Sequence, residues 1–364
     1  MCLLKGIPTW LQYIYRIAGI LQFSSTVPKN AIAKILSRLW CFPLYFLYYY
    51  IFVAWIITEH KTMEFGKIRR GIDMTITSVT FCSVTLSVVM FHRRSNQLQL
   101  LLTKVGGIKY ILQISPKKQS NHHDLFGSIL LVLIVLNFVF ACFLQNMEAT
   151  FLFFCYISPS IGALDHLFLS NILRFVRCQF ETINQHLQRQ VRAVDLSEIF
   201  PLTKAEKIKN MKEHEISFNI CKIQELSHLH YDLVNLATDI NKLFEITTIV
   251  SIAMWFGYVI DTIHYIIHVM IHTGENKILS LSCLGSYLLV FFLWLFIMVR
   301  SYSLTQKTAN TTSIYVHDIW NKYSQQNEVD RRVLHLQLIS FRPLNTKLRF
   351  TAMNLFSLDW TFCH

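Results

Sequence analysis

Charged residues and glycine are both scarce in this chain. Only 15% of its 364 residues are Asp, Glu, Lys or Arg, whereas 53% are hydrophobic, and the mean hydropathy is positive. A soluble protein of this length could not bury so many apolar runs, so the composition predicts several membrane spans. The sequence has only 11 glycines and no internal repeat. Both features argue against a secondary transporter, whose helices are typically repeated and broken by Gly and Pro.

Motifs for catalysis and metal binding are also missing. The sequence has no His-x-x-x-x-Asp acyltransferase motif, no His-Glu-x-x-His motif and no Gly-Lys-Ser/Thr phosphate loop. The nine cysteines are scattered without a Cys-x-x-Cys pair, which indicates neither a disulfide framework nor a zinc site. We therefore expect no enzymatic activity, no cofactor and no bound metal.

Long apolar runs are what the sequence has in abundance, and six of them are candidates to cross a hydrocarbon core of about 30 Å. The six are Leu39–Thr58, Ile72–Phe91, Leu125–Gln145, Phe151–Phe175, Leu243–Ile271 and Ile278–Val299. The second is the least hydrophobic because it is rich in Ser and Thr, whose hydroxyls can bond to the carbonyls of their own helix. The runs predict an all-α, polytopic membrane helix bundle.

Lysine and arginine alternate across the six runs. Five lie before the first run, six between the second and third, ten from Arg174 at the end of the fourth run to the start of the fifth, and eight after the sixth, whereas the other three connections hold four, none and one. Because cytoplasmic loops are enriched in these residues, the N-terminus and the C-terminus are both predicted to lie in the cytoplasm. The same bias explains the net charge of +12 without a nucleic-acid partner, since the basic residues do not share one face.

This topology divides the chain into five parts. They are a cytoplasmic N-terminus (1–38), transmembrane helices one to four (39–173), a long cytoplasmic helical connection (174–242), helices five and six (243–299) and a cytoplasmic helical tail (300–364).

Both large cytoplasmic parts carry apolar stripes at spacings of three and four, which predict amphipathic helices. One stripe is Val176, Phe180, Ile183, Leu187 and Val191; the next, after Phe200-Pro201, is Ile216, Ile220, Ile223, Leu226, Leu229, Leu233, Leu236, Ile240 and Leu243; a third is Thr312, Val316, Ile319 and Tyr323. A weaker stripe of Val333, Leu336, Gln337 and Ser340 precedes Pro343. Apolar stripes in water need partners, so we expect these helices to pack on one another and on copies of the chain.

The end of the sequence resembles the insect gustatory (taste) receptor family. The residues that carry the resemblance are Phe350, Thr351, Ala352, Leu355, Phe356, Leu358 and Asp359, which reproduce the family block F-T-A-x-x-L-F-x-L-D after the last apolar run. The resemblance implies a multi-pass plasma-membrane receptor with a cytoplasmic N-terminus and a family-typical seven spans. It also implies a ligand-gated cation channel subunit that detects a small-molecule tastant and assembles in the bilayer as a homo- or hetero-tetramer through a cytoplasmic anchor bundle.

One feature of the family is absent from the sequence. In the family the block leads into a seventh span, which lines the pore and ends in a Thr-Tyr…Gln-Phe signature, whereas here the sequence stops at His364. The resemblance therefore predicts a chain that does not conduct alone. An odorant-receptor-like chemosensory channel subunit is the alternative, followed by a secondary transporter or a membrane enzyme.

Ionisable residues inside the apolar runs are the candidates for function, because each is costly in lipid. Asp261, His264 and His268 share one face of the fifth run. We hypothesise that they line a ligand cavity in the outer half of the bundle, beside Trp255, Tyr258 and Tyr265. A metal would need further ligands from a second helix. The structural alternative pairs Asp261 with His264 and leaves His268 at the headgroup boundary.

The fourth run carries a second buried acid, Asp165, followed by His166. With Tyr156 it gives that helix a polar side. This side could face a ligand cavity or serve packing between helices.

Overall fold

The computed structural model describes residues 67–112, 122–144, 149–199, 207–271, 277–326, 347–353 and 355–359, with isolated helical positions between Tyr15 and Ile57. Its elements are α4 (Lys67–Ile111), α5 (His122–Leu144), α6 (Ala149–Ile199), α7 (Lys207–Ile271), α8 (Lys277–Gln326), β1 (Thr351–Ala352) and β2 (Phe356–Ser357). The predicted all-α bundle is confirmed for this part of the chain. Most of the first predicted span, Leu39–Thr58, lies outside the described residues.

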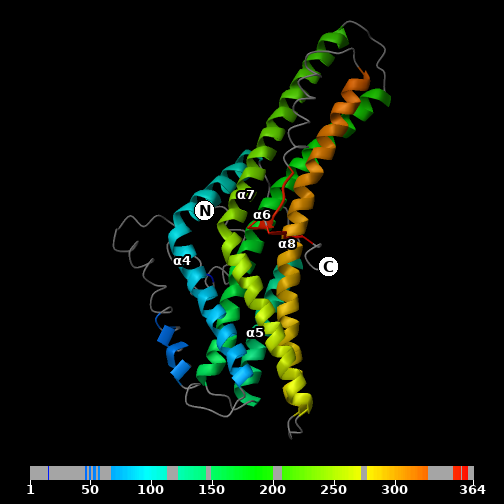
Figure 1. The fold of residues 1–364 in the computed structure, drawn as a ribbon. Helices are drawn as coiled ribbons and strands as arrows, with labels where there is room; N and C mark the ends of the chain where they lie inside the picture. Colours follow the sequence, from blue (N-terminus) through cyan, green and yellow to red (C-terminus); the bar gives the residue numbers. More distant parts are fainter. Residues whose placement is uncertain are drawn as a thin grey trace.

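The helices form a bundle from which α6, α7 and α8 extend well past α5 (Figure 1). Helix α6 lies at the centre: Phe168, Ile172, Val176, Phe180 and Ile183 on it are fully buried. The remaining described helices pack around this buried face.

The predicted cytoplasmic stripes form much of the core. Val176, Phe180, Ile183 and Leu187 on α6, Ile223, Leu233 and Ile240 on α7, and Thr312, Val316 and Ile319 on α8 are all fully buried. Helix α6 ends at Ile199, just before the predicted break at Pro201, and α7 runs unbroken from Lys207 to Ile271. The stripes therefore find partners within one chain.

Large exposed apolar side chains are concentrated along α5, at the end of α7 and at the start of α8. They are Ile129, Val132, Val135, Leu136 and Val139 on α5, Phe256, Ile260, Ile263, Ile267, Met270 and Ile271 on α7, and Ile278, Leu289, Phe292 and Phe296 on α8. Among the described residues, Cys221–Ile271 and Leu281–Asn321 are long and apolar enough to contain a membrane span, and Gly127–Asn137 is a shorter apolar helix. Such a face suits lipid contact.

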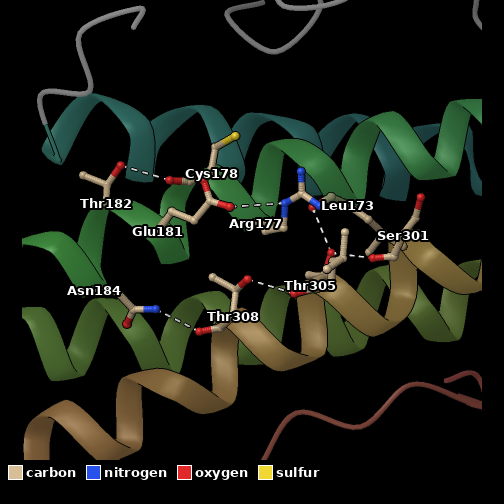
Figure 2. Close-up of polar contacts among 10 residues, drawn as sticks. Leu173, Arg177, Cys178, Glu181, Thr182, Asn184, Ser301, Thr305 and Thr308 are labelled. Carbon is tan, nitrogen blue, oxygen red and sulfur yellow. Dashed lines mark hydrogen bonds and ion pairs between the residues drawn. The ribbon is translucent and has the colours of Figure 1, made fainter. Parts of the chain in front are cut away.

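Small polar side chains join α6 to α8 along the other half of the bundle (Figure 2). Ser170 bonds to Ser301, and the Thr305 hydroxyl donates to the Leu173 carbonyl at 3.4 Å. Further along, the Asn184 amide donates to the Thr308 carbonyl at 2.9 Å, and its oxygen accepts from the Thr312 hydroxyl at 2.7 Å. These bonds fix how far α6 is shifted along α8.

Helix α4 continues past the predicted second span. The span is expected to end at Phe91, and the helix runs on to Ile111. Leu98, Leu101 and Val105 are buried, and the Gln179 side chain on α6 donates to the Val105 carbonyl at 2.9 Å. The apolar spacing of three and four in this segment explains the extension, which a search for uninterrupted apolar runs misses.

The family block is not helical, which corrects the prediction of a helical tail at this point. Helix α8 ends at Gln326, and the block forms a hairpin in which Thr351 pairs with Ser357 and Ala352 with Phe356. The Leu355 N–H donates to the Ala352 carbonyl at 2.9 Å, which closes the turn. The weaker stripe from Val333 to Ser340 lies outside the described residues.

The hairpin is tied to the helices by buried side chains and by two asparagines. Phe350, Ala352 and Leu358 are fully buried, and the Phe350 ring meets Tyr302 edge-on at 5.1 Å. Asn241 on α7 donates to the Thr351 carbonyl at 2.9 Å, and Asn310 on α8 bonds to the Leu348 backbone. The segment therefore rests on α7 and α8, beside the middle of the long helices (Figure 1).

Candidate ligand pocket

A cavity lies between α5, α6, α7 and α8 in the apolar half of the bundle. It is lined by Ile134, Asn137, Ser160, Ala163, Met254, Trp255, Tyr287, Val290, Phe291 and Trp294. The volume of the cavity is about 30 Å³, which is room for little more than a water molecule. Ligand pockets typically measure about 300–1,000 Å³, so a small organic molecule would enter only if the lining side chains move apart.

Aromatic rings form the wall of this cavity on the α7 and α8 side. Tyr258 stacks on Phe291 at 5.5 Å, and Tyr287 meets Phe291 edge-on at 4.7 Å. Trp255 meets Phe292 edge-on at 6.0 Å. Because rings pack rigidly and offer flat apolar surfaces, this wall favours a flat or cyclic apolar ligand.

Two polar groups, one in the lining and one directly behind it, are fixed by neighbours. The Asn137 amide donates to the Leu133 carbonyl of its own helix at 2.9 Å, and its oxygen accepts from the Ser286 hydroxyl on α8. The Thr80 hydroxyl on α4 donates to the Tyr258 hydroxyl at 3.1 Å, just behind the aromatic wall. These bonds tie α5 to α8 and α4 to α7 beside the wall.

Two other polar groups in the lining have no such neighbours. The indole N–H groups of Trp255 and Trp294 are buried, and neither meets an acceptor among the described residues. Both residues line the cavity and are about 95% buried. A buried donor without an acceptor is costly, so each indole would gain a hydrogen bond from a ligand oxygen placed within its reach.

Glycine at position 162 makes room for a flexible lining residue. A Cβ atom there would lie 3.3 Å from the Met254 Cε atom, tighter than an ordinary contact. Methionine adapts its shape to its surroundings, so Met254 can move as a ligand enters. The size of the cavity therefore depends partly on Gly162.

The predicted pocket residues divide into three groups. Trp255 lines the cavity, and Tyr258 packs directly against two of its lining rings. Further along α7, Asp261 and Tyr265 are half-buried and His264 is exposed, and none of the three lines this cavity. The side chains of His268 and Tyr156 lie outside the described residues.

The second buried acid sits beside the cavity rather than in its lining. Asp165 on α6 is 3% exposed. The ring of the adjacent His166 lies 5.0 Å from the lining residue Trp294. Asp165 and His166 therefore belong to the packing around the pocket.

Sequence reasoning missed Asn137, Met254 and Trp294 as lining residues. A search for ionisable groups cannot find them, because two are apolar or aromatic and one is a neutral amide. Only Asn137, a lone amide within the apolar third run, gave a signal that could have been followed. Among the described residues, no three His, Cys, Asp or Glu side chains lie close enough to hold a metal ion.

The sequence matches a model described as 7tm chemosensory receptor over residues 11–364. The chain belongs to this chemosensory receptor family. Its members are receptors rather than enzymes. No curated protein matches the sequence.

Two solved structures share the fold of this receptor. The insect olfactory receptor OR5 from Machilis hrabei has a TM-score of 0.67 at 11% identity, covering 99% of this chain and 94% of that one. The same receptor in complex with eugenol has a TM-score of 0.62 at 11% identity, covering 97% and 93%. At this identity the likeness establishes the fold of a membrane receptor bundle.

Proposed function

We propose that this receptor is a gustatory chemoreceptor, a ligand-gated cation channel subunit of the plasma membrane that detects a small tastant. The observation that carries the proposal is the cavity between α5, α6, α7 and α8, with two buried indole donors in its lining. Family membership supports a chemosensory role, and the family block at Phe350–Asp359 supports the gustatory branch. We propose a cytoplasmic N-terminus and assembly as a homo- or hetero-tetramer with other gustatory receptor subunits.

The ligand expected for this cavity is a compact, mostly apolar molecule with one or two hydrogen-bond acceptors. Apolar contact comes from the aromatic wall, and direction comes from the Trp255 and Trp294 N–H groups. Binding would shift the population toward a conformation in which α7 and α8 are spaced more widely around the ligand. Since α8 also carries the tail hairpin, that shift reaches the segment that in the family precedes the pore helix.

The outer polar face of α7 remains part of this proposal. Asp261, His264 and His268 would form a polar rim beyond the aromatic wall, through which a tastant reaches the cavity. The half-buried Asp261 and exposed His264 suit a rim better than an apolar binding surface. The rim and the cavity make separable contributions to ligand response.

The test is a ligand screen by calcium imaging in cells that express the receptor, with cells that lack it as the baseline. For a ligand that evokes current, Trp255→Phe and Trp294→Phe each remove one N–H group but keep an aromatic ring. Each should raise the half-maximal concentration by about tenfold, which is the effect of one lost hydrogen bond of ~1.4 kcal/mol.

Trp320→Phe is the matched control, because Trp320 stacks on His317 at the far end of α8, distant from the cavity. It should leave the dose-response curve unchanged. Equal responses from all three Trp→Phe variants would refute the cavity as the ligand site. Substrate uptake without current would instead indicate a transporter.

An odorant-receptor-like channel subunit is the second candidate. The aromatic, mostly apolar lining favours it, and the fold it shares with an olfactory receptor is compatible with it. A panel of volatile aromatic compounds tested beside water-soluble tastants separates the two. Responses confined to the volatile panel would favour the odorant type.

A further inference from the structure

The turn of the tail hairpin exposes two large apolar side chains. Met353 is 51% exposed and Leu355 is 73% exposed, whereas Phe350, Ala352 and Leu358 in the same hairpin are fully buried. We refer to Met353 and Leu355 as the hairpin tip. The buried residues already anchor the hairpin, so the tip is available for another contact.

The backbone at the tip is not relaxed. Met353 has a φ of 50°, in the left-handed region that glycine or asparagine adopts more easily than methionine. A methionine in this conformation with its side chain in the open gives up backbone stability without gaining burial. Such a residue is expected where an apolar side chain is needed at the surface.

The hairpin lies at the level where the helices change from apolar to charged. On α8 no charged residue occurs between Lys277 and Arg300, and Phe350 contacts Tyr302, two residues past Arg300. On α7 charged side chains recur up to Glu245, and Asn241 donates to the Thr351 carbonyl. Two helices therefore independently place the hairpin at the edge of the bilayer.

Basic residues border the tip on its N-terminal side. Lys347 and Arg349 are both exposed. An apolar projection bordered by lysine and arginine at a membrane edge is the pattern of a segment that inserts into the headgroup region of an anionic leaflet. If the tip docked on another protein instead, Lys347 and Arg349 would lack complementary charge unless that protein supplied acidic residues.

We propose that the hairpin tip docks on the bilayer itself, with Met353 and Leu355 inserted at the acyl boundary and Lys347 and Arg349 on anionic lipid headgroups. This would fix the tail relative to the membrane independently of the contacts that Asn241 and Asn310 make within the chain. The proposal rests on the membrane bundle and its boundary, not on the ligand, so a receptor without ligand response would leave it standing.

The test places an environment-sensitive fluorescent amino acid at position 355 of the full chain in lipid nanodiscs. The same probe at two positions on α8 gives the reference signals. Phe292, which is 55% exposed on the lipid-facing segment, is the reference for lipid contact. Ile314, which is 56% exposed and about 21 Å past Arg300 at 1.5 Å per residue, is the reference for water contact. Docking on lipid predicts quenching by brominated lipids comparable to that at 292, and protection from aqueous iodide relative to 314. A probe at 353 provides a second variant.

Iodide quenching at 355 as strong as at 314 would overturn the proposal. So would a probe that neither quencher reaches, because that result means the tip is covered by protein, such as a second copy. The double variant Lys347→Gln with Arg349→Gln should reduce brominated-lipid quenching several-fold in nanodiscs containing phosphatidylserine and have little effect in phosphatidylcholine alone. Equal quenching in both lipids, before and after substitution, would refute the role of the two cations.

Discussion

Asn310 holds Leu348 by both of that residue's backbone groups. Its side-chain oxygen accepts from the Leu348 N–H at 3.0 Å, and its amide donates to the Leu348 carbonyl at 3.2 Å. A single amide on α8 thereby fixes the start of the tail hairpin, 38 residues further along the chain. Both hydrogen bonds are part-buried, so water would replace them poorly.

Asn310→Ala should therefore destabilise the receptor by about 1–3 kcal/mol, because two backbone groups lose their partner. Thermal unfolding in detergent or nanodiscs measures the effect. Thr311→Ala is the control: Thr311 is half-buried and bonds to its own helix, so this change should cost less than about 0.5 kcal/mol. Equal melting temperatures for the parent and Asn310→Ala would contradict the role assigned to this contact.

The same asparagine reports on topology. Asn310-Thr311-Thr312 is a glycosylation sequon, and the predicted orientation places it in the cytoplasm, where no sugar is added. We expect no mobility shift on enzymatic deglycosylation, and staining of epitope tags at both termini only after cells are permeabilised. Sugar on Asn310, or surface staining of either tag, would invert the proposed orientation.

His230 predicts how stability depends on pH. Its ring is buried, meets Phe180 edge-on at 5.4 Å and bonds to the Ala309 carbonyl at 3.1 Å. Burial lowers the pKa of His230 to about 4, although the bond to Ala309 raises it slightly. In the unfolded chain the pKa of His230 is near 6.5. Between pH 4 and pH 6.5 the ring therefore binds a proton in the unfolded chain but not in the folded chain. Stability from this group is therefore full above pH 6.5 and is lost as the pH falls toward 4.

The expected loss is about 2 kcal/mol between pH 7.5 and pH 5. The loss should be smaller by about this amount in His230→Gln and unchanged in His228→Gln, since His228 is exposed on the same helix. Unfolding free energies of the three proteins at the two pH values test this. A pH dependence unchanged by His230→Gln would show that other groups carry it.

Gly162→Ala should shrink the ligand cavity. The added methyl group lies 3.3 Å from the Met254 Cε atom and would push that side chain toward the cavity. We expect the half-maximal concentration to rise about tenfold for the largest active ligands (~1.4 kcal/mol) and less for the smallest.

Gly285→Ala is the control for this change. It makes the same substitution on α8, where nothing lies within 4 Å of the added Cβ. It should leave ligand response unaltered and gain slightly in helix propensity. A uniform effect of Gly162→Ala across ligands of every size would argue against a steric cause.

Asp261→Asn and His264→Gln test the proposed polar rim. Because Asp261 is half-buried and His264 is exposed, each substitution should shift the dose-response curve by less than Trp255→Phe does, about threefold or less. Surface expression measured in parallel separates ligand response from folding. A larger shift than that of Trp255→Phe would move the binding site outward along α7.

The sequence by itself determined the class of fold, because hydrophobicity and periodicity are local properties of the chain. The apolar runs and the three-and-four stripes predicted a helical membrane bundle, and residues such as Val176, Phe180, Ile240 and Val316 are buried as those stripes require. The block from Phe350 to Asp359 indicated a chemoreceptor, and the family match confirms it.

Only the tertiary structure decided which residues meet. The cavity brings together Asn137, Ala163, Trp255 and Trp294 from four helices, and no spacing within one helix reveals which of its faces turns toward the other three. The hairpin at Thr351–Ser357 was also beyond local reasoning, because its strands are two residues long. Its geometry is held by Asn241, Tyr302 and Asn310 from distant parts of the chain. Contacts between residues far apart in sequence depend on the packing of whole helices, which a linear pattern does not encode.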